Sequence, residues 1–183
     1  MALARELAGT VTSFMNASPG MPAWLLYFSV ALIPVTLLHE LGHALAARRL
    51  LGGAVQVRVG TAGRLASVRL GQITVAVRAI SHPGRIQGVA FFDATRATAR
   101  DLVVVALAGP AASLLGFALA LWAYASVPAV GVVHNLLWCV TLASLGAVLN
   151  IIPFEFQERR GGPLLRTDGL VALKAARIAR ANV

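Results

Sequence analysis

Two long stretches of this 183-residue chain carry no charged side chain, residues 7–38 and residues 102–154. About 20 consecutive apolar residues are enough for a helix to cross the hydrocarbon core of a bilayer, so both stretches predict membrane-spanning helices. The second stretch is too long for a single span, and Pro128 and Gly131 interrupt it with residues typical of a turn. We therefore expect three spanning helices, over residues 22–51, 101–126 and 130–153.

The overall composition favours the same class of protein. Hydrophobic residues make up 58% of the chain and charged residues 13%, and the mean hydropathy is +0.77. Soluble domains are close to half apolar and a quarter charged, so this chain is too apolar for that class. We predict an integral membrane protein, mainly α, that forms one domain over residues 1–183, with residues 1–21 as a lead-in. The single cysteine, Cys139, excludes a disulfide framework.

The two segments outside the predicted spans have patterns of their own. In residues 52–100, Val55, Val57 and Val59 alternate with polar residues, and Ile73, Val75 and Val77 repeat the pattern. This period of two predicts short strands, and we expect a small β-sheet at the membrane surface. Residues 154–183 predict a loop with an Asp-Gly pair and then a short basic amphipathic helix, which either lies on the membrane or ends in solvent.

The basic residues predict an orientation. Nine of the 16 Lys and Arg residues lie within residues 48–100 and six within residues 159–180, and the net charge is +9. The positive-inside rule places both segments, with the predicted sheet, in the cytoplasm. A nucleic-acid surface would interleave basic with aromatic residues, and the middle segment offers only Phe91 and Phe92, so we expect no nucleic-acid partner.

The segment His39-Glu40-Leu41-Gly42-His43 lies in the first predicted span and fits the pattern H-E-x-x-H. On a helix, His39 and His43 share one face and can hold one metal ion together. Glu40 points about 100° away from His39, where it can reach a water molecule without being a ligand. With 4 His and 4 Glu in the chain, about 0.002 such matches are expected by chance. Ionisable groups inside a span are costly and indicate a functional site, so we predict a metal site here.

A catalytic zinc ion takes three protein ligands, so two histidines need a third partner. Asp168 is the strongest candidate because it starts the predicted C-terminal helix within Thr167-Asp168-Gly169. Asp93 and Asp101 are more simply interpreted as surface or helix-start residues, and His134 lies near the far end of the third predicted span. The remaining candidates are Glu155, Glu158 and His82.

The set of motifs resembles the site-2 protease family of intramembrane metalloproteases. The H-E-x-x-H segment is followed by Asn150-Ile151-Ile152-Pro153 and then by Asp168-Gly169, and Ala108-Gly109-Pro110 is similar to a small-residue motif of that family. The resemblance implies that His39, His43 and Asp168 bind Zn²⁺, that Glu40 is the catalytic base, and that Asn150 lies near the metal or binds substrate. Asn150 and Asp168 are farther apart than in the family's compact segment, so residues 154–167 must loop out and return Asp168 to the site.

The depths of these residues agree with one site. Counted from the basic ends of the spans, His43, His39, Gly109 and Asn150 lie about 8, 14, 12 and 5 Å deep, all in the same half of the membrane. We therefore expect an intramembrane zinc endopeptidase that cleaves membrane proteins in regulated intramembrane proteolysis, with its catalytic side toward the cytoplasm. The alternatives are a non-catalytic metal-binding membrane protein: a carrier, a sensor or a degenerate scaffold. The sequence predicts no particular oligomeric state.

Overall fold

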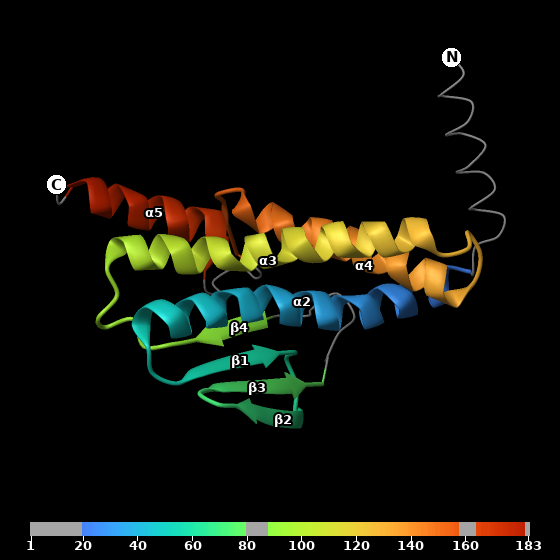
Figure 1. The fold of residues 1–183 in the computed structure, drawn as a ribbon, viewed down its shortest axis with the longest axis horizontal. Helices are drawn as coiled ribbons and strands as arrows, with labels where there is room; N and C mark the ends of the chain where they lie inside the picture. Colours follow the sequence, from blue (N-terminus) through green and yellow to red (C-terminus); the bar gives the residue numbers. More distant parts are fainter. Residues whose placement is uncertain (1–19, 80–87, 158–163, 182–183) are drawn as a thin grey trace, which may run out of the picture.

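A computed structural model describes residues 20–79, 88–157 and 164–181, and it is mainly helical with a small mixed sheet (Figure 1). Most of the predicted lead-in, residues 1–19, lies outside the described residues. Among the described residues, three helices are long and apolar enough to cross a membrane. They are α2 (Met21–Leu51), α3 (Ala99–Ser126) and α4 (Val132–Val148), which continues as the 3-10 turn η1 (Leu149–Ile151).

The ends of these helices follow from local chemistry. A capping box starts α3 two residues before the predicted boundary: Thr98 Oγ1 accepts a hydrogen bond from the Asp101 N–H, and the Asp101 carboxylate accepts one from the Thr98 N–H. The third helix is shorter than predicted. Pro153 disfavours helical geometry at Ile152, which is extended with φ −72° and ψ 123°, so regular helix ends before the predicted boundary at residue 153.

Four strands form one sheet: β1 (Val55–Val59), β2 (Arg64–Leu70), β3 (Ile73–Arg78) and β4 (Gly88–Phe91). Their order in the sheet is β2-β3-β1-β4. Strand β1 pairs parallel with β3 and antiparallel with β4, and β2 pairs antiparallel with β3.

The sheet packs along the second half of α2 rather than beyond its end (Figure 1). The alternation in β1 buries Val55, Val57 and Val59 in one core with Ala44 and Ala47 of α2. The outer strand β4 reaches farther along the helix, where Gly88 lies against the side chains of Thr36 and Glu40. The sheet therefore extends to the level of the H-E-x-x-H segment, and its place at the membrane surface stays a prediction.

The polar insertion after η1 forms a second, two-stranded sheet. Strand β5 (Glu155–Gln157) pairs antiparallel with β6 (Leu164–Arg166), and helix α5 (Asp168–Ala181) follows directly. Helix α5 packs beside α3 (Figure 1). Its buried positions are the small residues Gly169, Ala172 and Ala175. Its basic side chains are exposed: Lys174, Arg177 and Arg180.

Candidate metal centre

His39 and His43 lie one turn apart on α2 and are both buried, with exposed fractions of 5% and 8%. Their Nε2 atoms face each other at 3.2 Å. The carboxylate of Asp168 completes the group: Oδ2 lies 2.9 Å from His39 Nε2, and Oδ1 lies 3.3 Å from His43 Nε2. One ligand atom from each of the three residues lies within 4.8 Å of the others, so the group can hold a metal ion.

Asp168 is the first residue of α5, where the helix dipole favours a negative charge. Burial raises the pKa of its carboxyl group, but the hydrogen bonds that His39 and His43 donate when their imidazoles are protonated outweigh burial and lower this pKa to about 2. The group is therefore ionised at neutral pH, as a carboxylate ligand must be.

Helix α3 fixes the orientation of both imidazole rings. His43 Nδ1 lies 2.7 Å from the carbonyl oxygen of Val105, and His39 Nδ1 lies 2.8 Å from the hydroxyl of Ser113. A carbonyl oxygen only accepts hydrogen bonds, so His43 Nδ1 carries the proton and, in the neutral ring, Nε2 presents a lone pair. The hydroxyl of Ser113 can accept a hydrogen bond, so it is compatible with the same tautomer of His39, in which a second lone pair points toward the first.

This arrangement fits a cation. In the neutral rings, two nitrogen lone pairs and an ionised carboxylate converge on one buried point, where lone pairs cannot hydrogen-bond to one another. A divalent ion would bind all three of these ligand groups. A histidine whose other ring nitrogen is held by a hydrogen bond is the usual form of a metal ligand.

Close packing of α3 against α2 depends on small residues. A Cβ atom at Gly109 would collide with the ring of His43, and one at Gly42 would collide with the backbone of Ala108. At Gly109 the neighbouring group is therefore an imidazole of the site itself.

Glu40 is also buried, with 8% of its surface exposed, and strand β4 lies against it. The Ala90 N–H donates a hydrogen bond to the carboxylate of Glu40, and a Cβ at Gly88 would collide with the same side chain. The base candidate is therefore oriented by a strand that is distant from it in the sequence.

The other candidates for a third ligand have different surroundings. Asp101 belongs to the capping box of α3, Asp93 accepts a hydrogen bond from the Thr95 N–H, and Glu155 pairs with Arg166 and Lys174. His82 and Glu158 lie outside the described residues.

The sequence also singled out His134 and Asn150, which lie in α4 and in η1. His134 is buried in α4, where the centroid of its ring lies 4.2 Å from the centroid of the Tyr124 ring. Asn150 lies in η1, next to Ile151, and its predicted role near the metal or substrate stays a prediction.

Sequence reasoning missed Ser113 and the contacts of β4. Ser113 is fully buried in an apolar helix and lies one turn after Gly109. A lone hydroxyl in a predicted span was the available signal, but serine in an apolar helix more often bonds to its own backbone.

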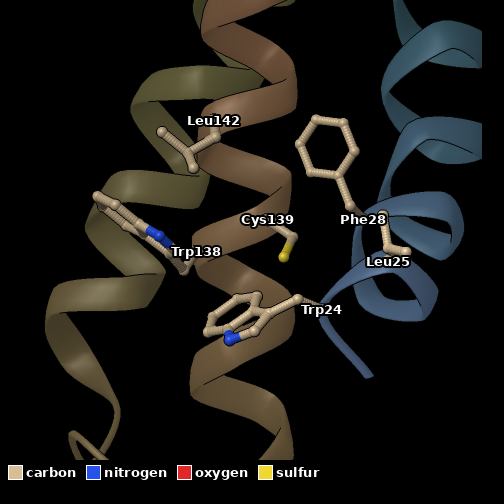
Figure 2. Close-up of a pocket in the computed structure, with 6 residues that line it drawn as sticks. All are labelled: Trp24, Leu25, Phe28, Trp138, Cys139 and Leu142. Atoms are coloured by element: carbon tan, nitrogen blue, oxygen red, sulfur yellow. The ribbon is translucent and has the colours of Figure 1, made fainter. Parts of the chain in front are cut away.

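A separate groove lies between the first turns of α2 and the middle of α4 (Figure 2). Trp24 is 15 residues before His39, which corresponds to about 22 Å along the helix. The groove is almost wholly apolar and takes no part in the metal centre. Its lining residues are Trp24, Leu25, Phe28, Trp138, Cys139 and Leu142.

No family model, no curated protein and no solved structure matches this chain.

Proposed function

We propose that this protein is a zinc-dependent endopeptidase that works within the membrane and cleaves membrane-spanning or membrane-proximal proteins. One observation carries the proposal: Asp168, 125 residues after His43 in the sequence, lies against both histidines of the H-E-x-x-H segment. A glutamate adjacent to one of those histidines is what a hydrolytic site needs in addition.

His39, His43 and Asp168 would hold the ion, because two imidazoles and one carboxylate form a known ligand set of catalytic zinc. The bound ion would supply Lewis acidity, which polarises the scissile carbonyl and makes water a stronger acid. Ser113 and Val105 would keep the two imidazoles in the required tautomer.

In this mechanism Glu40 moves the proton. Its carboxylate accepts a proton from the attacking water as the water oxygen bonds to the carbonyl carbon. Glu40 then donates that proton to the leaving amide nitrogen as the carbon–nitrogen bond breaks. The hydrogen bond from Ala90 would keep the carboxylate oriented through both steps. In the same proposal, Asn150 stabilises the oxyanion or binds the substrate backbone.

The substrate would have to be extended at the cut, because a peptide bond inside a helix is shielded by its neighbours. Strand β4 is one of the two outer strands of its sheet and lies beside Glu40. An extended substrate segment that pairs with this strand would pass close to the base. The basic segments would face the cytoplasm, so cleavage would occur on that side of the membrane.

The decisive variant is Glu40→Gln, which keeps the size of the side chain and removes its basicity. The purified full-length protein is reconstituted in liposomes with a panel of membrane-spanning peptides that carry central Gly or Pro residues. Products are identified by mass spectrometry, and bound zinc is measured in parallel. We expect cleavage to fall by about 10²- to 10⁴-fold while zinc binding is retained.

Asp93→Asn is the matched control, since it also converts an acid to an amide but at an exposed turn. It should cleave like the wild type. Zinc binding without any cleavage by the wild type would instead favour the non-catalytic alternative of a metal carrier, sensor or scaffold.

A further inference from the structure

Asp168 reaches the metal centre at the end of an insertion, and hydrogen bonds at the base of this insertion fix its position. The insertion leaves η1, forms strands β5 and β6, and comes back at Thr167, the residue before Asp168. Because a flexible connection of this length would leave Asp168 many positions to occupy, something must fix the point of return.

The side chain of Thr167 ties the two ends of the insertion together. Its hydroxyl donates to the carbonyl oxygen of Ile152 at 2.7 Å and accepts from the N–H of Phe154 at 3.0 Å. The backbone N–H of Thr167 also donates to the carbonyl oxygen of Phe154 at 3.2 Å. Thr167 is buried, with 4% of its surface exposed, so these bonds are shielded from water.

The next two residues follow directly from this junction. The carbonyl oxygen of Thr167 accepts hydrogen bonds from the N–H groups of Leu170 and Val171, which starts helix α5. Gly169 lies so close to the carbonyl of Ile151 that a Cβ atom would collide with it. Asp168 is therefore held between a hydroxyl fixed on Ile152 and Phe154 and a glycine packed on Ile151.

We propose that Thr167 is a positioning residue, which places the Asp168 carboxylate against His39 and His43 and so completes the metal site. This inference depends on the metal site of the proposed function, but not on peptidase activity. Thr167 has no contact with the ligand atoms themselves among its described hydrogen bonds, and it acts through the backbone of its neighbour.

Removal of the hydroxyl should weaken metal binding more than it weakens the fold. In Thr167→Val the shape of the side chain is kept, but the Ile152 carbonyl and the Phe154 N–H both lose this partner. Supporting groups of metal ligands commonly change affinity by about 10- to 100-fold, and we expect a loss of Zn²⁺ affinity in that range. Thr167→Ser keeps the hydroxyl and should bind Zn²⁺ within about threefold of the wild type.

The experiment measures the Zn²⁺ dissociation constant of the full chain in detergent, by competition with a chromophoric chelator. Thr141→Val is the matched control: Thr141 is also buried, and its hydroxyl donates to the Leu137 carbonyl within α4. The control should bind Zn²⁺ like the wild type. Wild-type affinity in Thr167→Val, or an equal loss in Thr141→Val, would overturn the proposal.

A double-mutant cycle tests whether Thr167 acts through Asp168. In an Asp168→Ala background, Thr167→Val should cause no further loss of affinity, whereas a residue that only supports the fold would cause the same loss in both backgrounds. If Thr167→Val does not yield folded protein, Thr167→Cys takes its place in the cycle, with the same loss expected from its weaker hydrogen bonding. Peptidase activity is not the readout, so an inactive protein with the predicted cycle would refute the proposed function and leave this inference standing.

Discussion

At the scale of single residues, the site depends on groups that never touch the metal position. Each histidine uses one ring nitrogen for a fixed partner on α3 and turns the other toward Asp168. The two partners differ in kind, since Val105 offers a backbone carbonyl and Ser113 a side-chain hydroxyl. Only the second can be removed by substitution, which makes the orientation of His39 open to test.

Ser113→Ala should weaken Zn²⁺ binding by about 10- to 100-fold, because His39 Nδ1 loses its hydrogen-bond partner and the ring is no longer held. Alanine is small enough for this fully buried position, so it adds no clash. The free energy of unfolding should still fall by about 1–3 kcal/mol, which is the usual cost of a lost buried hydrogen bond. Chelator competition and thermal unfolding measure the two effects. Ser29→Ala is the control, since Ser29 donates only to the Leu25 carbonyl at the distant end of α2. Equal Zn²⁺ affinity in the two variants would count against this role of Ser113.

At the scale of elements, glycines decide which backbones approach the site. Gly42 and Gly109 let α2 and α3 come together, Gly88 lets β4 lie against Glu40, and Gly169 lets α5 begin on Ile151. In each case the missing side chain leaves room for a neighbouring segment, so these contacts set where the elements meet.

Gly169→Ala separates helix propensity from site geometry. Alanine favours a helix by about 1 kcal/mol over glycine, so α5 itself should not be weakened. Its Cβ would nevertheless collide with the Ile151 carbonyl and push the first turn of α5, with Asp168, away from the histidines. We expect Zn²⁺ affinity to drop at least tenfold, as measured by the same chelator competition.

Gly146→Ala provides the comparison, because a Cβ atom at this position of α4 meets nothing within 4 Å. It should leave Zn²⁺ affinity unchanged. Similar affinities in both variants would mean that the start of α5 does not set the position of Asp168.

The elements also show where sequence reasoning succeeds. The three apolar helices were predictable because hydropathy over 20 or so residues is a local signal. The sheet was predictable because apolar and polar residues alternate in β1, where buried and partly buried positions alternate in turn. The parallel pairing of β1 with β3 was not, since pairing is a long-range choice that alternation leaves open. The hairpin of β5 and β6 was missed because strands of three residues have too few positions for a periodic pattern.

Within the site, the sequence motifs identified three residues that the fold brings together, His39, His43 and Asp168. They could not identify Thr167, Ser113 or Gly88 as supports. These residues act through hydrogen bonds and close approaches to segments far away in the sequence, and their types are common elsewhere in the chain.

At the scale of the whole molecule, the site joins parts that local forces would not hold together. α2 supplies both histidines and Glu40, α3 orients the histidines, β4 orients Glu40, and α5 supplies Asp168. Without an ion, an ionised carboxylate and two imidazoles share a buried space. A ligand that binds this folded arrangement, and not the unfolded chain, must therefore stabilise the whole molecule.

Zn²⁺ should raise the thermal unfolding midpoint of the wild type in detergent, and a chelator should reverse the effect. With free Zn²⁺ at 1,000 times its dissociation constant, the gain in unfolding free energy is about 4 kcal/mol. Asp168→Ala should lose most of this gain, because two histidines alone bind far more weakly, whereas Asp93→Asn should keep it. A Zn²⁺-induced shift in Asp168→Ala as large as that of the wild type would show that the ion stabilises the fold from another position, and α5 would then not be tied to α2 through the metal.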